Sequence, residues 1–317
     1  MKALEHALDE LSRELDHEPH LEHAASGRAD EAVPALRDHL YSKYFCRWDA
    51  QSASHGRYSA RTSGEPAFVA ALAAAGRGAL CWEPGWTVVK AEAGWAFVSN
   101  GRVNLFVDDR AQLAPREARV GAPVSVRMPC ARENVSPGYF HLVGRSGPVR
   151  RAEAHYELFL NLCPAAAAPW VSALLRGPRL ERLRFEAKVA NSPGAYCRVD
   201  TAHLYVEPAS YPGLLAFARS WRHAHPGWWR KGTPLFTREL APGLAVGEAP
   251  RGRGAESFGQ ERCRLAAEEV AAALEVGDRA ASSWCVRVEA RFSRERLPLE
   301  GTVRSPGPRR KETEGPR

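Results

Sequence analysis

The sequence predicts an α+β fold, with twisted, mainly antiparallel sheet structure flanked by helices and preceded by a helical N-terminal segment. Apolar residues recur at helical spacing near the start of the chain, and strand-like alternation dominates its middle. After residue 150, predicted strands and helices follow one another. The chain has 317 residues, 44% hydrophobic and 26% charged, which is typical of a soluble globular protein with one large domain or two lobes.

The first two predicted elements are helices. Leu4, Leu8, Leu11 and Leu15 recur at helical spacing between residue 2 and about residue 16. A second helix is predicted at residues 30–44. It leads into the aromatic sequence LYSKYFCRW, which we expect to pack in the interior rather than to react.

The middle of the chain is predicted to form short strands around one helix, Pro66–Gly76. Asn100-Gly101 lies between two alternating runs and is the strongest hairpin signal in the sequence. Pro137-Gly138 marks another turn, which a strand follows. These signals predict a twisted antiparallel sheet.

The remainder of the chain alternates between the two kinds of element. We expect a strand at 154–162, two strands around a turn at 183–206, helices at 164–175, 211–223 and 257–274, and a last strand at 283–292. Ser257 is the expected N-cap of the third helix, and residues 237–247 are expected to be irregular. The predicted parts are an N-terminal helical segment, 1–50, a strand-rich lobe, 51–149, an α+β lobe that carries the site, 150–300, and a disordered tail, 301–317.

The stretch 183–208 is the candidate working centre. Its first strand alternates apolar and charged residues, and the sequence NSPG then makes a turn. If the two strands pair, Lys188, Arg198 and Asp200 converge on one sheet surface. Two cations and a carboxylate suit an oxyanion such as phosphate. The alternative is a solvated face with an Arg–Asp ion pair.

A second candidate anion site is the start of the helix that Ser257 caps. A helix N-terminus attracts anions, and Arg262 follows within its first turns. Simple capping plus a surface arginine is the alternative interpretation.

Charge and cysteine content limit the function classes. The net charge is +7 and the isoelectric point about 9.2, with many arginines inside apolar runs, which favours discrete anion sites over a nucleic-acid stripe. The seven cysteines show no CxxC pair and no zinc-like spacing, so we expect no metal and reduced thiols in the cytoplasm. No signal peptide opens the chain and no run is long enough to cross a bilayer, so no membrane partner is expected.

The order of five short sequences resembles the HopA effector-type lyase family. From Tyr139 to about Leu274 they are SPGYFHLVG, HYELFLNLCP, FEAKVANSPGAYCRVDTAHLYVEP, GTPLFTRELAPGLAVGEAP and ESFGQERCRLAAE. LYSKYF also fits the family's usual beginning, so the resemblance covers most of the chain. The matching residues are Lys188, Arg198, Asp200, Tyr205, Pro234, Thr237, Ser257, Phe258, Gly259 and Arg262. His203 departs from the pattern, because an aliphatic residue is expected there, and strand alternation is expected to turn it away from the partners of Lys188.

The resemblance implies a lyase that removes phosphate from phosphoserine or phosphothreonine and leaves dehydroalanine or dehydrobutyrine. Such family members serve class V lanthipeptide and thioamitide biosynthesis, where a separate kinase that resembles aminoglycoside phosphotransferases phosphorylates a precursor peptide. The resemblance also implies a second context, a type III effector that acts on host proteins. A third reading is a non-catalytic phosphopeptide-binding partner of the kinase.

β-Elimination needs a base, stabilisation of enolate-like charge and a proton for the leaving phosphate, but no cofactor. We hypothesise that Lys188 is the base, with a pKa lowered by neighbouring cations and burial, and that Tyr205 or His155 protonates the phosphate. The alternative is that Lys188 is one more phosphate cation. The expected phosphate ligands are Arg198, Arg238, Ser257, Arg262 and Lys231. The expected orienting and substrate-holding residues are Asp200, Asn161 and Asn191, of which the two asparagines fit a structural role equally well.

Overall fold

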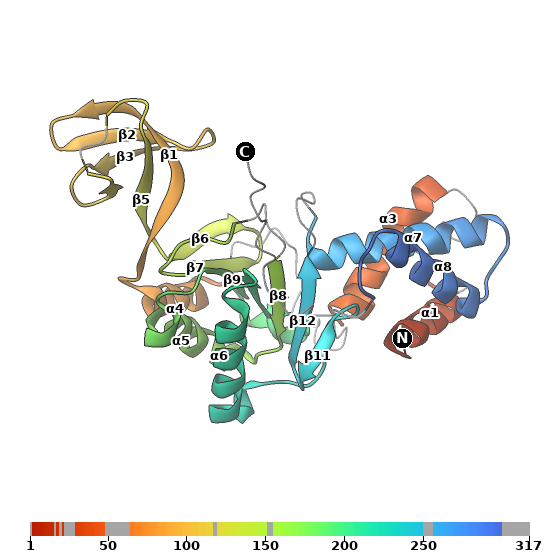
Figure 1. Ribbon diagram of the computed structural model, residues 1–317. Helices are drawn as coiled ribbons and strands as arrows, with labels where there is room; N and C mark the ends of the chain where they lie inside the picture. Colours follow the sequence, from red (N-terminus) through yellow and green to blue (C-terminus); the bar gives the residue numbers. More distant parts are fainter. Residues whose placement is uncertain are drawn as a thin grey trace, which may run out of the picture.

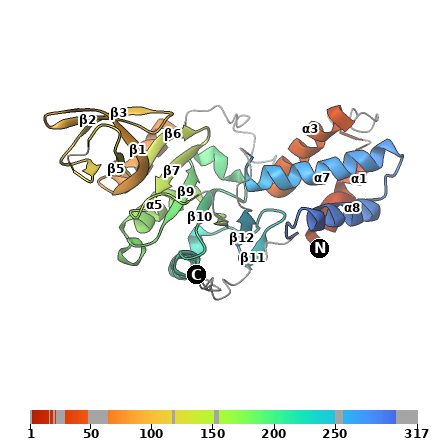
Figure 2. The same cartoon turned by 45° about the horizontal axis from the view of Figure 1, so that its top comes forward.

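The computed structural model describes residues 2–15, 17–18, 21, 29–47, 64–116, 119–150, 155–249 and 256–299. Within these residues the protein has two antiparallel sheets and a set of helices, which confirms the predicted α+β class. In Figures 1 and 2 a five-stranded sheet stands at one end of the molecule and helices from the two ends of the chain stand at the other. A seven-stranded sheet lies between them. The predicted tail, 301–317, lies outside the described residues.

The helical end combines early and late parts of the chain. It consists of α1 (Lys2–Glu14), α3 (Ala29–His39), η1 (Leu40–Phe45), α7 (Phe258–Glu275) and α8 (Ala281–Arg294). The helices turn apolar stripes toward one another, so Leu8, Leu36 and Val270 share a core. The predicted packing of the aromatic sequence is confirmed, because Tyr44 and Phe45 of the π-helical turn η1 are buried in that core.

The predicted strand at 283–292 is wrong, because these residues belong to α8. Trp284, Val288 and Phe292 recur every four residues and are fully buried, whereas Val286 is 65% exposed. A large apolar residue at every fourth position gives one continuous stripe on a helix. This spacing, rather than the alternation of Val286 and Val288, determines the structure of the segment.

The five-stranded sheet has its own small core. Its strands are β1 (Leu80–Glu92), β2 (Trp95–Ser99), β3 (Asn104–Asp108), β4 (Leu113–Ala114) and β5 (Pro123–Pro129), in the order β3-β2-β1-β5-β4. The predicted hairpin is confirmed, since Asn100 and Gly101 connect β2 to β3. Gly101 has φ 82°, a conformation that glycine adopts without steric cost. Trp86, Val98 and Val126 fill the interior.

The seven-stranded sheet holds the candidate site. Its strands are β6 (Ala131–Ser136), β7 (Tyr139–Val143), β8 (His155–Leu160), β9 (Phe185–Ala190), β10 (Ala202–Val206), β11 (Arg238–Ala241) and β12 (Leu244–Ala249), in the order β11-β12-β8-β10-β9-β7-β6. The hairpin of β11 and β12 occupies the stretch that we expected to be irregular. Pro242 and Gly243, with φ 78° at Gly243, form its turn.

One face of this sheet packs against three helices, α4 (Pro66–Gly76), α5 (Ala167–Arg176) and α6 (Tyr211–Ala224). α4 and α6 lie within one residue of their predicted positions, whereas α5 begins three residues after its predicted start, because Pro164–Ala166 forms a 3-10 turn, η3. β6 and β7 come from the stretch assigned to the 51–149 lobe, yet β7 pairs with β9. The proposed domain boundaries stay a prediction.

Candidate functional site

Lys188 projects from the face of the seven-stranded sheet that lies opposite α4, α5 and α6. Its neighbours Ala187 and Val189 are buried in the core with those helices, so alternation turns Glu186 and Lys188 to the other side. We call this other side the site face. The register of the sheet places His203 of β10 directly beside Lys188.

The Lys188 ammonium lies between two aromatic rings. Its Nζ is 4.6 Å from the ring centre of Tyr139 and 5.6 Å from that of Tyr205. Among the residues that the structure describes, no carboxylate oxygen lies within 4.0 Å of this amine. Burial lowers the pKa of Lys188, although Glu157 and Asp200 oppose that effect from farther away. A lowered pKa increases the neutral fraction that can accept a proton.

Arg198 and Asp200 form a buried ion pair next to Lys188. Their exposed fractions are 7% and 0%, Nη2 of Arg198 lies 2.6 Å from Oδ2 of Asp200, and Nε donates to Oδ1. Burial alone would raise the pKa of Asp200, but the charge of Arg198, its two hydrogen bonds and the nearby His203 ring bring this pKa well below its usual range. The predicted pairing is therefore present. The Arg198 guanidinium carbon is 5.9 Å from the ring centre of Tyr139, so the ring contacts both cations.

The N-terminal helices complete the surroundings of this ion pair. Nη2 of Arg198 lies 3.0 Å from the Cys46 sulfur and 3.4 Å from the Tyr41 hydroxyl. The backbone N–H of Val199 also donates to the Cys46 carbonyl. The segment between β9 and β10 is thus tied to the end of η1.

The expected orientation of His203 away from the partners of Lys188 is wrong, because the ring lies next to Asp200. That expectation assumed one continuous strand from 196 to 206, in which alternate residues share a face. Instead Pro193–Cys197 is a 3-10 turn, η5, and β10 begins at Ala202, so alternation does not extend back to Arg198. Nδ1 of His203 lies 2.6 Å from Oε1 of Glu157, and Nε2 lies 3.3 Å from Oδ2 of Asp200.

Both expected proton donors lie on the site face, Tyr205 on β10 and His155 on β8. The rings of Tyr205 and His155 have centres 6.1 Å apart, and Tyr205 also contacts the Lys188 amine. Nδ1 of His155 is buried and has no hydrogen-bond partner within the described residues. The geometry therefore offers a phenol near the amine and an imidazole on the far side of that phenol.

At the start of α7, the predicted N-cap at Ser257 is confirmed. Its hydroxyl accepts from the Gln260 N–H, and the Gln260 side chain returns to the Ser257 N–H as a capping box. Arg262 is fully buried, with Nη1 2.9 Å from Glu261 and Nη2 donating to the Glu248 carbonyl. Its guanidinium lies 3.8 Å from the centre of the Phe258 ring. These contacts join α7 to β12.

Arg262 is connected to the site through aromatic rings. The Phe258 ring centre is 5.4 Å from that of Phe159, which lies 5.0 Å from the His203 ring. Arg262 is therefore separated from His203 by the rings of Phe258 and Phe159. Contact between Arg262 and a phosphate stays a prediction.

The two remaining expected phosphate contacts are Arg238 and Lys231. Arg238 pairs with Val246, which is buried in the core with α4, α5 and α6, and it interacts with Tyr211 of α6. It is therefore on the face opposite Lys188. Lys231 is exposed in the loop before β11, and its carbonyl accepts a 2.8 Å hydrogen bond from the Asn161 side chain.

Asn161 and Asn191 connect loops to the sheet. The backbone N–H of Asn161 donates to Gly243, and that of Asn191 donates to Gly138. In each side chain Oδ1 is buried and lacks a hydrogen-bond partner in the part of the chain that is described. A role in holding substrate stays a prediction for both.

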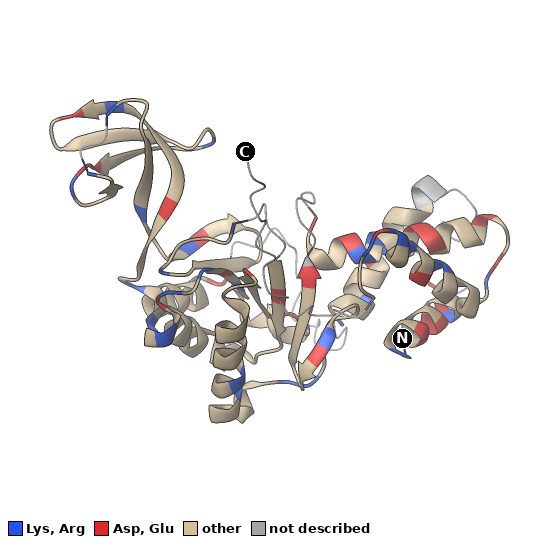
Figure 3. Ribbon diagram, viewed as in Figure 1, with Lys and Arg blue, Asp and Glu red and all other residues tan. Residues whose placement is uncertain are grey.

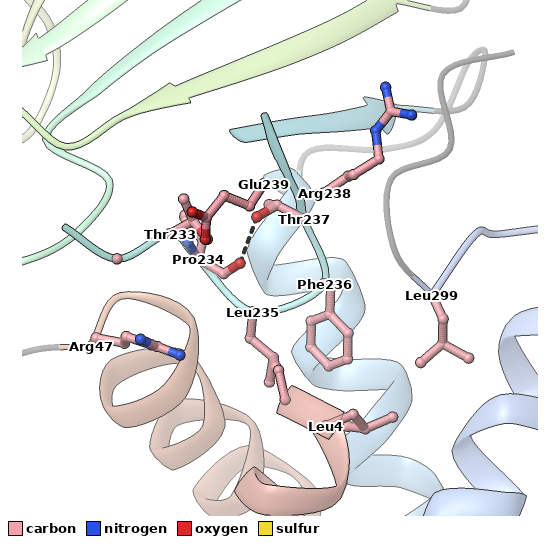
Figure 4. A pocket seen from close by; sticks show the side chains of 12 residues that line it. Leu4, Arg47, Thr233, Pro234, Leu235, Phe236, Thr237, Arg238, Glu239 and Leu299 are labelled. Carbon is pink, nitrogen blue, oxygen red and sulfur yellow. Dashed lines mark hydrogen bonds between the residues drawn. The ribbon is translucent and has the colours of Figure 1, made fainter. Parts of the chain in front are cut away.

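A separate cavity of about 370 Å³ lies between the start of α1 and the loop before β11 (Figure 4). Arg47 points toward it and Arg238 points away from it. Its apolar lining is Leu4, Leu235, Phe236 and Leu299. Neither Lys188 nor Arg198 lines it, but a side chain at Gly232 in its wall would touch Val199.

Sequence reasoning missed three residues of the site, Tyr139, Glu157 and Cys46. Glu157 had a detectable signal, because a carboxylate inside the apolar run HYELFLNL must find a partner if the strand is buried. Cys46 had none, since it lies 152 residues from Arg198 in sequence. Tyr139 follows a turn and is brought to Lys188 only by the pairing of β7 with β9.

A family model matches residues 130–297, just over half of the chain, and it describes the HopA1 effector protein family. The chain belongs to this family. The family part of the resemblance is therefore confirmed. The match by the HopA1 model includes every expected site residue, from His155 to Arg262, and it begins after the five-stranded sheet.

Two solved structures of effector proteins from Pseudomonas syringae are similar to this HopA1-family chain. One is from pv. tomato strain DC3000, with 13% identity, coverage of 93% of this chain and 95% of that chain, and a TM-score of 0.46. The other is from pv. syringae strain 61, with 17% identity, coverage of 83% and 93%, and a TM-score of 0.40. No curated protein sequence matches the chain.

The described residues contain no group of three His, Cys, Asp or Glu side chains arranged to hold a metal ion. None of the described helices combines the length and apolar character needed to cross a membrane. The seven cysteines are free thiols in this structure. Basic and acidic residues are interspersed along the ribbon of both sheets and the helical end (Figure 3).

Proposed function

We propose that this HopA1-family protein is a lyase that β-eliminates phosphate from phosphoserine or phosphothreonine in a peptide. The observation that carries the proposal is the Lys188 amine, which is half-buried, has a lowered pKa and has no carboxylate partner within the described residues. The order of short sequences that resembles the family's lyases supports the same reaction.

In the proposed reaction, neutral Lys188 removes the proton from the α-carbon of the phosphorylated residue. A double bond forms between the α- and β-carbons, and the bond from the β-carbon to the phosphate oxygen breaks, with its electron pair leaving on phosphate. The products are a dehydroamino acid and inorganic phosphate, and Lys188 becomes an ammonium. Tyr205 or His155 donates a proton to the departing phosphate.

Arg198 is the proposed phosphate contact. It shares the Tyr139 ring with Lys188, so a phosphate at the guanidinium brings the α-carbon near the amine. Asp200 holds Arg198 in that position through two hydrogen bonds. Arg238, on the opposite face of the sheet, and Lys231, an exposed residue of the loop before β11, have no part in the proposed reaction. Arg262 has a supporting position behind Phe258, and Ser257 has the role of cap.

The proposed substrate is a phosphorylated precursor peptide of a lanthipeptide or thioamitide pathway, supplied by an aminoglycoside-phosphotransferase-like kinase. Two other functions use the same cations, namely phosphopeptide binding without turnover and action on host proteins as an effector. A phosphopeptide-binding protein would leave the bound phosphopeptide unchanged. An effector would act on a host protein instead of a precursor peptide. A reaction with synthetic phosphopeptides separates binding from elimination.

We expect the wild-type protein to convert a phosphothreonine peptide into a dehydrobutyrine peptide, with release of one equivalent of phosphate. Mass spectrometry detects the loss of phosphoric acid, and added thiol gives an adduct with the new double bond. Because the base acts as the neutral amine, kcat/KM rises with pH through the pKa of Lys188, with an inflection below that of an ordinary lysine. Recovery of threonine instead indicates a phosphatase, and an unchanged, bound peptide indicates a binding protein.

A further inference from the structure

Two buried carboxylates share the site face with Lys188, yet neither forms an ion pair with it. Glu157 is 2% exposed and Asp200 is fully buried, and both act on the amine through space to raise its pKa. A closer approach by either one would strengthen that effect, because an opposite charge within a few ångströms favours the ammonium. A base at Lys188 therefore requires both carboxylates to be held elsewhere.

His203 lies on the strand from which one side chain can keep a carboxylate away from the Lys188 amine. β10 lies between β8, which carries Glu157, and β9, which carries Lys188. From β10 the imidazole reaches Glu157 with Nδ1, at 2.6 Å, and Asp200 with Nε2, at 3.3 Å. Nδ1 is within hydrogen-bond distance of Glu157, whereas Nε2 is buried next to Asp200 and has no hydrogen-bond partner within the described residues.

We propose that His203 is a positioning residue that keeps Lys188 without a carboxylate partner, because it holds Glu157 through Nδ1 and places its ring between Glu157 and Asp200. Asp200 is held by two hydrogen bonds from Arg198, so Glu157 is the carboxylate that depends on His203. This inference rests on the proposed function only for its consequence on rate. The effect of His203 on the pKa of Lys188 does not depend on any reaction, because it follows from the positions of the charged groups in the folded protein.

Other titratable, charged and aromatic groups also face Lys188 and influence its pKa. Across the neighbouring strands they are Tyr139 and His141 of β7, Glu186 of β9 and Tyr205 of β10. From the segment before β10 and the end of η1 they are Arg198 and Cys46. His141 is a matched comparison for His203. It flanks Lys188 from the opposite side, and its Nε2 lies 2.6 Å from the Ser136 hydroxyl.

The test measures the pKa of Lys188 directly. The sequence contains six lysines, so NMR of protein labelled at the lysine ε-carbon gives few signals, and Lys188→Met assigns the relevant one. In His203→Leu, Glu157 loses its partner and turns to the amine, and we expect the pKa of Lys188 to rise by about one unit or more. In His141→Leu we expect no change. This readout does not require turnover, so it remains informative if elimination is never observed.

If the wild type is a lyase, the same variant has a defined kinetic signature. The pH profile of kcat/KM moves to higher pH in His203→Leu, with at least about a tenfold loss near neutral pH that disappears in base. His203→Leu/Glu157→Leu removes the buried carboxylate together with its partner, and it should keep the Lys188 pKa at or below the wild-type value. This double variant also decides the matter if the single variant does not fold, since an apolar pair often replaces a buried ion pair without loss of stability. A pKa unchanged in His203→Leu, equally raised in His141→Leu, or raised in the double variant overturns the proposal.

Discussion

Lys188→Met is expected to lower kcat for β-elimination by about 10²- to 10⁴-fold, which is the usual contribution of a positioned base. Methionine keeps an unbranched side chain between the Tyr139 and Tyr205 rings but cannot accept a proton. Phosphopeptide binding, measured by fluorescence anisotropy, is expected to persist through Arg198. Lys90→Met is the matched control, because Lys90 is an exposed lysine of the five-stranded sheet that pairs with Glu92.

The same substitution should not destabilise the protein. Folding lowers the pKa of Lys188, so the unfolded chain binds this proton more tightly than the folded chain does. The ammonium therefore opposes folding at pH values below its folded pKa, and stability rises as the pH increases through that value. Removing the amine relieves this cost at neutral pH. A melting temperature at or above that of the wild type, together with lost turnover, separates chemistry from folding. Normal turnover would remove Lys188 from the mechanism.

Asp200→Asn is expected to cost about 3 to 5 kcal/mol in the free energy of unfolding, the range for removing one partner of a buried ion pair. The carboxylate is fully buried and accepts two hydrogen bonds from Arg198, which is itself 7% exposed. Urea unfolding measures the loss. Because folding lowers the pKa of Asp200, its stabilising contribution is present above the unfolded pKa and disappears as the pH falls through the folded one.

A double variant separates the stability of this pair from its role in the site. In Arg198→Met/Asp200→Leu the buried charges are replaced by apolar side chains, so most of the lost stability is expected to return. Phosphopeptide binding is not expected to return, since the guanidinium is absent. A loss below about 1 kcal/mol in Asp200→Asn, or full phosphopeptide affinity in the double variant, would contradict the assigned roles.

The helices were predictable because their signals are local. The apolar stripe of α1, the proline at the start of α4 and the Ser257 cap each lie within one or two turns of the element that they define. The hairpin at Asn100-Gly101 has the same local character. α8 shows where local signals fail. Its alternating valines suggested a strand, whereas Trp284, Val288 and Phe292 form a helical stripe.

The site was predictable only in part, because its residues meet through long-range pairing. Lys188 and Arg198 come from one continuous stretch, and their proximity followed from expecting a turn between two strands. The break of that second strand at η5 changed which residues share the site face, and it brought His203 beside Lys188. Tyr139, Glu157 and Cys46 arrive from other strands and from the N-terminal helices, whose pairing no short pattern in the sequence specifies.

The central claim is that the amine of Lys188 removes the α-proton of a phosphorylated residue. A peptide with deuterium on the α-carbon of its phosphothreonine tests this claim directly when it is incubated with the wild-type protein. The account predicts a dehydrobutyrine product without the deuterium, formed more slowly than from the protonated peptide, and no such product with Lys188→Met. Threonine that retains the deuterium, or dehydrobutyrine formed at the normal rate by Lys188→Met, would contradict it.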